Sequence, residues 1–388
     1  MDLELDDAQK LIIENVRRFI REEIRPLEQD LDPDAYSLHP DDRDRLVQMV
    51  KEMGLYQMDI PTDYGGPGVD TVTRTLVAEE LSQHRAGLYA PAYGVFGSGP
   101  PGQLYSGSDY IKEHYLWPGI RGEKHGFFGL SEASGGSDPA RAIQTRAVRD
   151  GDEWVINGSK LWNSGADTAD YGIVYVRTDP EKGRQGITAF VVDTDTPGFR
   201  VERLVQVLRA HYTTELSFTD MRVPHDHILG EEGGGFALAS GQLASNRIPY
   251  SSACIGVAVY ANELAIDWAK QRVTFGEPLA NRQAIQWMLV DNEIDIRTSR
   301  WIALDAAAKA ERGEPFRFES SMAKLICTEG AGRVVDRCMQ IFGGLGMAKE
   351  MPLERWYREL RIRRVGEGPS EVQRIVMARE ILNVRSGS

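Results

Sequence analysis

Apolar residues recur at helical spacing along roughly the first 120 residues of the chain. After an acidic pair at residues 6–7, which is typical of a helix cap, this spacing continues until Pro26, at Leu11, Ile12, Val16, Phe19, Ile20 and Ile24. A second helix is predicted from about Arg43 to Met53, and a third through Leu76, Val77 and Leu81. A turn-rich loop at 61–68 separates them. We therefore expect the amino-terminal third to be all-α.

The pattern changes to a period of two in the middle of the chain. Apolar runs at 145–148 and 154–156 flank Asp150-Gly151-Asp152, which is a hairpin signal. Further strands are predicted at 173–176 and 187–192, with short ones at 216–218 and Val223. The glycines at 233–235 resemble a hinge into the last part. A central β domain, barrel-like or a sandwich, is expected here.

Helical periodicity returns after the glycines and continues to the end. Long helices are predicted at about 237–272, 283–311, 317–343 and 352–361, and a last one from near Pro369. Their broad apolar faces are typical of a helix bundle that also contacts another subunit. We expect an α+β protein of three domains, namely an all-α domain over 1–123, a β domain over 124–235 and a four-helix-bundle domain over 236–388.

Composition excludes several classes of function. The 388 residues carry a net charge of −13 without a block of Lys and Arg, so the chain would repel nucleic acid. The apolar runs are shorter than the ~18 to 20 residues that cross a bilayer, and the first residues are acidic where a targeting peptide is basic. We expect a soluble, cytoplasmic protein that binds neither nucleic acid nor membrane.

Cysteine and histidine give no sign of a metal centre. The three cysteines lack CxxC spacing, which argues against a disulfide framework and a structural zinc. His225 and His227 have no third ligand nearby in the sequence. No metal site is expected.

Four polar, glycine-bearing segments are candidates for chemistry, and each has a plainer interpretation. Gly343-Gly344-x-Gly346 lacks the third glycine of a dinucleotide fingerprint and follows a predicted helix, so it is either a helix-ending turn or a loop that contacts a cofactor. The loop at 130–138 is a domain-junction turn or a ligand-binding loop. Trp162, at a strand rim, is a core aromatic or a ligand contact. Glu367, between glycines and before a helix, is a helix cap or a reactive acid.

In their order, these segments resemble the acyl-CoA dehydrogenase family over essentially the whole chain. The matching motifs are Ser131-Glu132 with Gly136-Ser137-Asp138, Asn157-Gly158-x-Lys160-x-Trp162, Arg272-x-Thr274-Phe275-Gly276, Gln340-Ile341-Phe342-Gly343-Gly344-x-Gly346, and Glu367-Gly368. The resemblance implies an FAD-dependent desaturation of an acyl-CoA thioester. In that reaction the catalytic base removes the α-proton and flavin N5 takes the β-hydride. Electron-transferring flavoprotein would then accept the electrons, and the enzyme would be a homotetramer or homodimer.

The resemblance also assigns roles to individual residues. The flavin ring would be contacted by Leu130, Ser131, Trp162 and Ser164. The rest of an FAD bound mainly by a neighbouring subunit would be held by Arg272, Phe275, Gln283, Gln340 and Gly344. Pro369 and Glu371 would lie close to the cofactor, and Ser137 and Arg247 near the thioester and its CoA part. Glu367 would be the catalytic base.

The chemistry that the resemblance implies fits these residue types, and the chain departs from the family pattern at three of the positions below. Removing a proton next to a thioester carbonyl requires a desolvated carboxylate with a raised pKa. Gly366 stands where many relatives carry Tyr, so we expect Gly366 to line a wider acyl pocket for a bulky, branched or cyclic group. Asn246 stands where some relatives place the base, and no other acid lies within 243–250. Pro369 replaces a Thr, which puts a local flavin contact in doubt.

The same motifs leave alternatives open. One alternative is an enzyme with the same fold and different flavin chemistry, namely an acyl-CoA oxidase, a flavin monooxygenase or a desulfinating enzyme. From a different class, it would be a non-catalytic flavin- or CoA-binding protein. Glu367 and Arg247 argue against the non-catalytic alternative, because such a protein has no need of a base.

Overall fold

The computed structural model describes residues 5–208 and 212–383 and divides them into two compact units. One unit joins the amino-terminal segment up to Ser98 to the chain from Ala244 onward, and the other runs from Gly99 to Leu243. The amino-terminal and carboxy-terminal helices therefore share one unit. Within residues 5–208 and 212–383, no helix combines the length and apolar character needed to span a bilayer.

The amino-terminal helices of the first unit are α1 (Asp7–Phe19), α2 (Arg25–Leu27), α3 (Pro40–Glu52) and α4 (Thr71–Leu81). The expected cap of α1 is confirmed, because Asp6 accepts from the backbone N–H of Gln9 at 2.8 Å while the Gln9 side chain accepts from the backbone N–H of Asp6. Pro26 has no N–H to give, and the chain approaches it through a π-helical turn at Ile20–Ile24. The helical path therefore runs to Leu27, one residue beyond the predicted stop.

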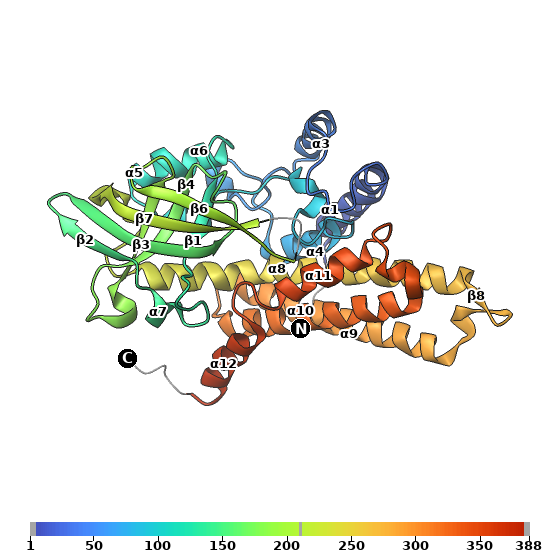
Figure 1. Cartoon of the computed structure of the whole chain (residues 1–388). Coiled ribbons are helices and arrows are strands. Elements are labelled where there is room, and N and C mark those ends of the chain that lie inside the picture. Colours follow the sequence, from blue (N-terminus) through green and yellow to red (C-terminus); the bar gives the residue numbers. More distant parts are fainter. Residues whose placement is uncertain (1–4, 209–211, 384–388) are drawn as a thin grey trace. The chain divides into compact units, whose positions relative to one another are not determined.

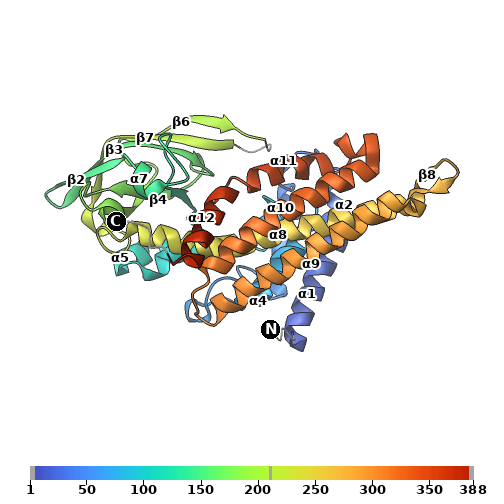
Figure 2. The same cartoon turned by 90° about the horizontal axis from the view of Figure 1, so that it is seen from below.

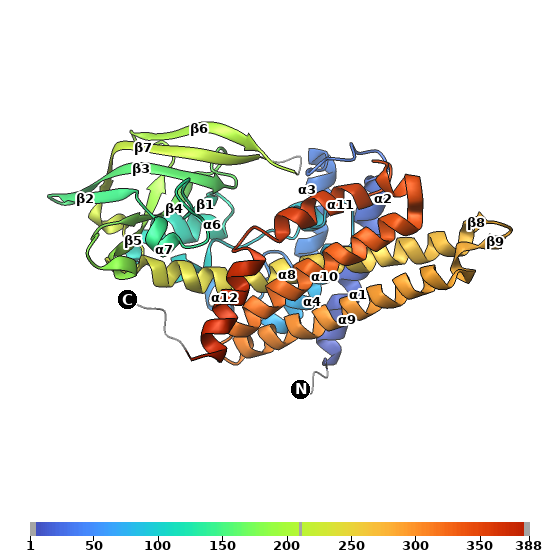
Figure 3. The same cartoon turned by 60° about the horizontal axis from the view of Figure 1, so that its bottom comes forward.

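The carboxy-terminal part supplies the long helices of the same unit (Figure 1). They are α8 (Gly235–Gln271), whose residues before Ala244 belong to the other unit, α9 (Gln283–Glu311), α10 (Arg317–Phe342), α11 (Leu353–Arg363) and α12 (Ser370–Ile381). Figure 2 shows α9 and α10 side by side. A short hairpin of β8 (Val273–Thr274) and β9 (Glu277–Pro278) joins α8 to α9, and Figure 3 shows it at the joined ends of these helices. Alanines, cysteines and valines of α8 and α10 pack around the fully buried Trp356 of α11.

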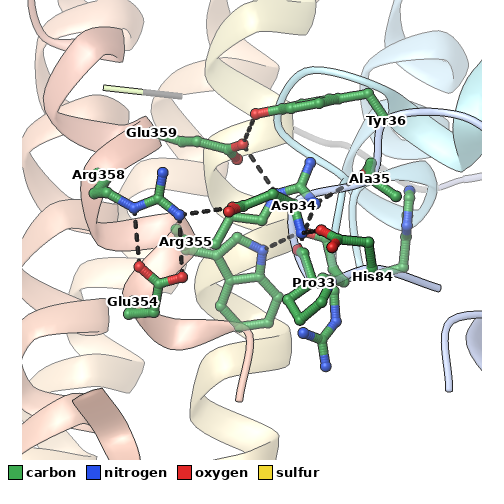
Figure 4. A network of polar contacts seen from close by, with 12 residues as sticks. Pro33, Asp34, Ala35, Tyr36, His84, Glu354, Arg355, Arg358 and Glu359 are labelled. Carbon is green, nitrogen blue, oxygen red and sulfur yellow. Dashed lines mark hydrogen bonds and ion pairs between the residues drawn. The ribbon is translucent and has the colours of Figure 1, made fainter. Parts of the chain in front are cut away.

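A network of polar contacts ties α11 to the amino-terminal segment (Figure 4). Arg355 is buried, pairs with Glu359 at 3.0 Å and donates to the carbonyl oxygens of Pro33 and Ala35 at 3.0 and 2.8 Å. Tyr36 donates its hydroxyl to Glu359. Because buried charges are stable only when paired and hydrogen-bonded, this network fixes α11 against the loop at 33–36.

The second unit is built on one bent, mixed sheet of seven strands in the order β1-β4-β2-β3-β7-β6, with β5 paired to β4. The strands are β1 (Gly126–Gly129), β2 (Arg146–Asp150), β3 (Glu153–Asn163), β4 (Tyr171–Arg177), β5 (Ile187–Asp193), β6 (Phe199–Gln206) and β7 (Tyr212–Pro224). Short helices α5 (Asp109–Ile111), α6 (Trp117–Ile120) and α7 (Pro139–Ala142) belong to this unit. The predicted hairpin is confirmed, since β2 and β3 pair antiparallel across Gly151. The expected order of an all-α, a β and an all-α part is likewise confirmed.

Candidate active site

Glu367 lies in the turn between α11 and α12, with its backbone in the left-handed region at a φ of 55°. Gly368 follows at a φ of 92°. A non-glycine residue with positive φ costs free energy and persists only where its surroundings hold it. Pro369 is the N-cap of α12, and no side chain caps that helix. The interpretation of Glu367 as a helix cap is therefore wrong.

Side chains from three helices hold this turn. Arg247 of α8 donates to the backbone carbonyl of Glu367 at 3.2 Å from Nη2 and 3.3 Å from Nε. Gln373 of α12 donates to the carbonyls of Glu367 and Gly368 at 3.3 and 2.8 Å. Lys324 of α10 donates to the Gly368 carbonyl at 2.8 Å. These bonds oppose the strain at Glu367 and fix the direction of its side chain.

Burial and nearby cations act on the pKa of the Glu367 carboxylate in opposite directions. Its Oε2 atom is buried and has no hydrogen-bond partner among the described residues. Burial raises the pKa of Glu367 above its usual 4.5, whereas the cations Arg363, Arg247 and Lys324 act to lower it, and burial prevails. Burial has the opposite effect on a cationic group and lowers the pKa of Lys324 to about 8. A buried, unpartnered carboxylate with a raised pKa is equipped to take a proton from a ligand.

Gly366, next to Glu367, lies against Tyr250. A Cβ atom at Gly366 would lie 2.8 Å from the hydroxyl oxygen of Tyr250. That hydroxyl donates to the backbone carbonyl of Arg363 at 3.2 Å, so it is held in place. A side chain at position 366 would therefore meet Tyr250 at its first carbon, and the wider acyl pocket expected from Gly366 stays a prediction.

In the second unit, a buried ion pair holds the loop that carries Leu130 and Ser131. Lys160 of β3 is fully buried and donates to Glu132 at 2.7 Å and to the carbonyl of Leu130 at 3.2 Å. Glu132 also accepts the backbone N–H groups of residues 144 and 145 at 2.7 and 3.1 Å. The Ser131 carbonyl accepts from the backbone N–H of Leu161 at 2.9 Å. The loop is thus fixed to β3, which is more than a plain junction turn needs.

Trp162 is turned outward by a β-bulge near the end of β3. The register between β3 and β7 shifts between Leu161 and Asn163, and Trp162 takes a φ of 69°. Asn163 and Thr214 exchange side-chain hydrogen bonds with each other's backbone carbonyls at 3.3 and 3.0 Å, which anchors the bulge. Trp162 exposes 54% of its surface, so its interpretation as a core residue is wrong. Ser164 and Ser137 are exposed in the same unit.

The residues assigned to the remainder of the cofactor are exposed on the first unit. Arg272, Phe275 and Gln283 gather at the hairpin of β8 and β9, where Phe275 exposes 97% of its surface at a φ of 50°. Gln340 and Gly344 lie at the end of α10, where Gly343 terminates the helix with a φ of 64°. The helix-ending interpretation of this turn is confirmed. Glu371 is exposed in the first turn of α12.

Sequence reasoning missed the residues that surround Glu367 in space. Lys324, Gln373, Tyr250 and Arg363 were not among the expected site residues. Gln373 and Arg363 are close to Glu367 in sequence, at the ends of the flanking helices, and polar side chains there were a usable signal. Tyr250 and Lys324 are remote in sequence and gave none.

The chain is similar to known proteins over nearly its whole length. Three family models match consecutive parts of the chain: acyl-CoA dehydrogenase, N-terminal domain, at residues 6–123; middle domain, at 127–221; and C-terminal domain, at 233–382. The short-chain specific acyl-CoA dehydrogenase of mitochondria from Rattus norvegicus is 35% identical over 384 residues, covering 98% of this chain and 91% of its own.

Solved structures give the same result. Butyryl-CoA dehydrogenase from Megasphaera elsdenii superimposes with a TM-score of 0.86 at 32% identity, over 98% of this chain and 100% of that one. A chain from the structure described as the electron transferring flavoprotein of Acidaminococcus fermentans superimposes with a TM-score of 0.87, also at 32% identity, over 98% and 100%.

Proposed function

The chain belongs to the acyl-CoA dehydrogenase family, and from that premise we propose that it desaturates an acyl-CoA thioester with Glu367 as the catalytic base. The single observation that carries this proposal is the buried Oε2 of Glu367, which has no partner among the described residues. Asn246 leaves the stretch 243–250 of α8 without an acid, so no second carboxylate in that stretch competes for the role.

The reaction removes a proton from Cα and a hydride from Cβ, and a carbon–carbon double bond remains. Glu367 takes the proton on its carboxylate. Because burial raises the pKa of Glu367, the carboxylate is a stronger base than an exposed glutamate. Arg247 binds the carbonyl of the same residue, so its role in this proposal is to position the base. Contact between Arg247 and the CoA part remains part of the proposal.

Enzymes of this family use FAD, and the residues of the second unit fit such a cofactor. Trp162 offers an exposed aromatic face, and the Leu130–Ser131 loop offers backbone groups that the Lys160–Glu132 pair holds in place. When bound, the flavin supplies a hydride acceptor, which no amino-acid side chain can supply. We assign the ring contacts to Leu130, Ser131, Trp162 and Ser164.

A second copy of the chain would complete the cofactor site. The exposed Phe275, with Arg272 and Gln283 beside it, is the surface that we assign to an FAD shared between subunits. Gln340, Gly344, Pro369 and Glu371 belong to the same proposal. The exposed apolar residues of α9, at Trp287, Val290, Ile294 and Trp301, suit a helix-to-helix contact in a homotetramer or homodimer. Light scattering would give the mass of the oligomer in solution. Trp287→Glu should lower that mass, because it places a charge in the proposed helix-to-helix contact.

Anaerobic titration of the FAD-loaded protein with a panel of acyl-CoA esters tests the activity. Loss of flavin absorbance with at least one ester is the expected result, and no loss with any ester would refute the dehydrogenase. Slow reoxidation in air is expected if electron-transferring flavoprotein is the acceptor. Peroxide formed at the rate of substrate oxidation would instead identify an acyl-CoA oxidase.

The size of the acyl group is a finer part of the proposal. The rat relative is named for short chains, whereas Gly366 suggested a bulky, branched or cyclic group. The hydroxyl of Tyr250 opposes that suggestion, because it occupies the place beside Gly366. Comparing straight and branched esters on the natural enzyme and on Gly366→Tyr decides the question. Unchanged preference between them would remove Gly366 as a determinant.

A further inference from the structure

Arg363 is a buried cation at the end of α11, four positions before Glu367. It is only 6% exposed. Its guanidinium carbon lies 3.9 Å from the ring centre of Tyr250 and 4.4 Å from that of Tyr89. Aromatic rings attract a cation, but they offer no lone pair to its N–H groups. The two tyrosines therefore hold Arg363 in place and leave its donors available.

These donors lack an anionic partner among residues 5–208 and 212–383. The Nε of Arg363 is buried without a hydrogen bond among the described residues, and no carboxylate of those residues forms an ion pair with it. Arg355, two turns earlier on α11, is equally buried and also has one nitrogen, Nη2, without a hydrogen bond in that part of the chain, but it has an anionic partner in Glu359 (Figure 4). A fold that pairs one buried arginine of this helix and leaves the next unpaired indicates that the second has a partner from outside.

The charges around Glu367 do not balance. Three cationic side chains, Arg247, Lys324 and Arg363, act on the single carboxylate of Glu367. The first two donate to backbone carbonyls of the turn, which neutralise no charge. Burying an unpaired cation costs more free energy than contact with two aromatic rings returns. A second negative charge close to Glu367 would remove this deficit.

We propose that Arg363 binds a carboxylate carried by the acyl chain, so that the substrate is a CoA thioester of a dicarboxylic acid. This inference rests on the proposed function and names the substrate class of the same site. The distal carboxylate would receive charge-assisted hydrogen bonds from the planar guanidinium, whose fork of donors matches a carboxylate. It takes no part in the bond changes. The proton still passes from Cα to Glu367, and the hydride leaves Cβ.

Butyryl-CoA and glutaryl-CoA, which differ by a terminal carboxylate, are the probes. With the FAD-loaded natural enzyme under anaerobic conditions, we expect glutaryl-CoA to bleach the flavin with a higher kcat/KM than butyryl-CoA. Arg363→Met should lower the ratio of the two kcat/KM values by roughly 100-fold, the size expected for charge-assisted hydrogen bonds. Arg363→Lys, which keeps the charge but not the fork, should lower it less.

Arg361→Met is the matched control, because Arg361 is exposed on the same helix and the substitution is the same. It should leave the ratio unchanged. An equal fall with both esters in Arg363→Met would show that Arg363 positions Glu367 instead of binding substrate. The natural enzyme gives an independent answer if that variant does not fold: preference for butyryl-CoA would overturn the inference while the dehydrogenase stands. Failure of every ester to bleach the flavin would instead overturn the proposed function.

Discussion

Lys160 and Glu132 form a 2.7 Å ion pair that solvent hardly reaches, since the side chains are 0% and 5% exposed. The pair lies behind the backbone of Leu130 and Ser131 and connects their loop to β3. Its position explains how a polar, glycine-bearing loop is kept in one conformation without a regular hydrogen-bond ladder. The arrangement also makes the loop sensitive to either partner.

Replacing Lys160 by Met should destabilise the protein by about 3–5 kcal/mol, because it leaves the Glu132 carboxylate buried without its counter-ion. Chemical denaturation followed by circular dichroism measures the loss. Lys182→Met is the control, because Lys182 pairs with Asp179 at an exposed site and its loss should be small. A Lys160→Met protein as stable as the natural one would show that the pair does not hold the loop.

Glu367→Gln should retain FAD and still bind acyl-CoA, yet lose exchange of the α-proton by roughly 10²- to 10⁴-fold, the usual contribution of a general base. Incorporation of deuterium from heavy water into the substrate measures the exchange. Glu380→Gln, at an exposed position of α12, should exchange at the natural rate. Full exchange in Glu367→Gln would place the base elsewhere.

The pH dependence of kcat/KM should report the ionisation of the buried Glu367 carboxylate. Burial raises the pKa of Glu367 above 4.5, and only the ionised form is a base, so kcat/KM should fall as pH drops through that raised pKa. Arg363 lowers the same pKa, so Arg363→Met should shift the acid limb of the profile to higher pH. A limb that stays in place would mean that the two charges do not interact.

Tyr250 and Gly366 should be coupled in stability. Gly366→Ala brings a methyl group against the Tyr250 hydroxyl and should cost about 1–3 kcal/mol, as overpacking usually does. In a Tyr250→Phe background the same change should cost less, since the next ring atom is 3.9 Å away. Denaturation of both single variants and the double variant measures the coupling. Equal costs in the two backgrounds would contradict this contact.

Much of the fold could be predicted from the sequence because hydrophobic periodicity is a local property. The helix predicted at 283–311 is observed at Gln283–Glu311, and the one predicted at 237–272 is observed at Gly235–Gln271. The hairpin at Gly151 follows from turn chemistry, which is also local. By contrast, the pairing of β1 with β4 and the shared core of both chain ends depend on contacts between distant residues.

The candidate site could be predicted only in part. Family motifs predicted Glu367 and Trp162 as site residues, and these roles stay predictions. The residues next to Glu367 in the sequence did not indicate its left-handed backbone. The unexpected feature is the filling of the space at Gly366 by Tyr250, because a missing side chain is visible in the sequence while the group that replaces it is not. The same reason hid the contacts between Arg363 and its two tyrosines.

The hydrogen bonds between Arg355 and the loop at 33–36 have a consequence for synthesis of the protein. Arg355 and Pro33 are 322 positions apart, so the first helices leave the ribosome long before α11 exists. At 5–20 residues per second the delay is roughly 15 to 65 s. During that interval α1, α3 and α4 can already pack on one another, whereas α4 still lacks its contact with α9. The loop at 33–36 should therefore take its final place only after α11 has emerged.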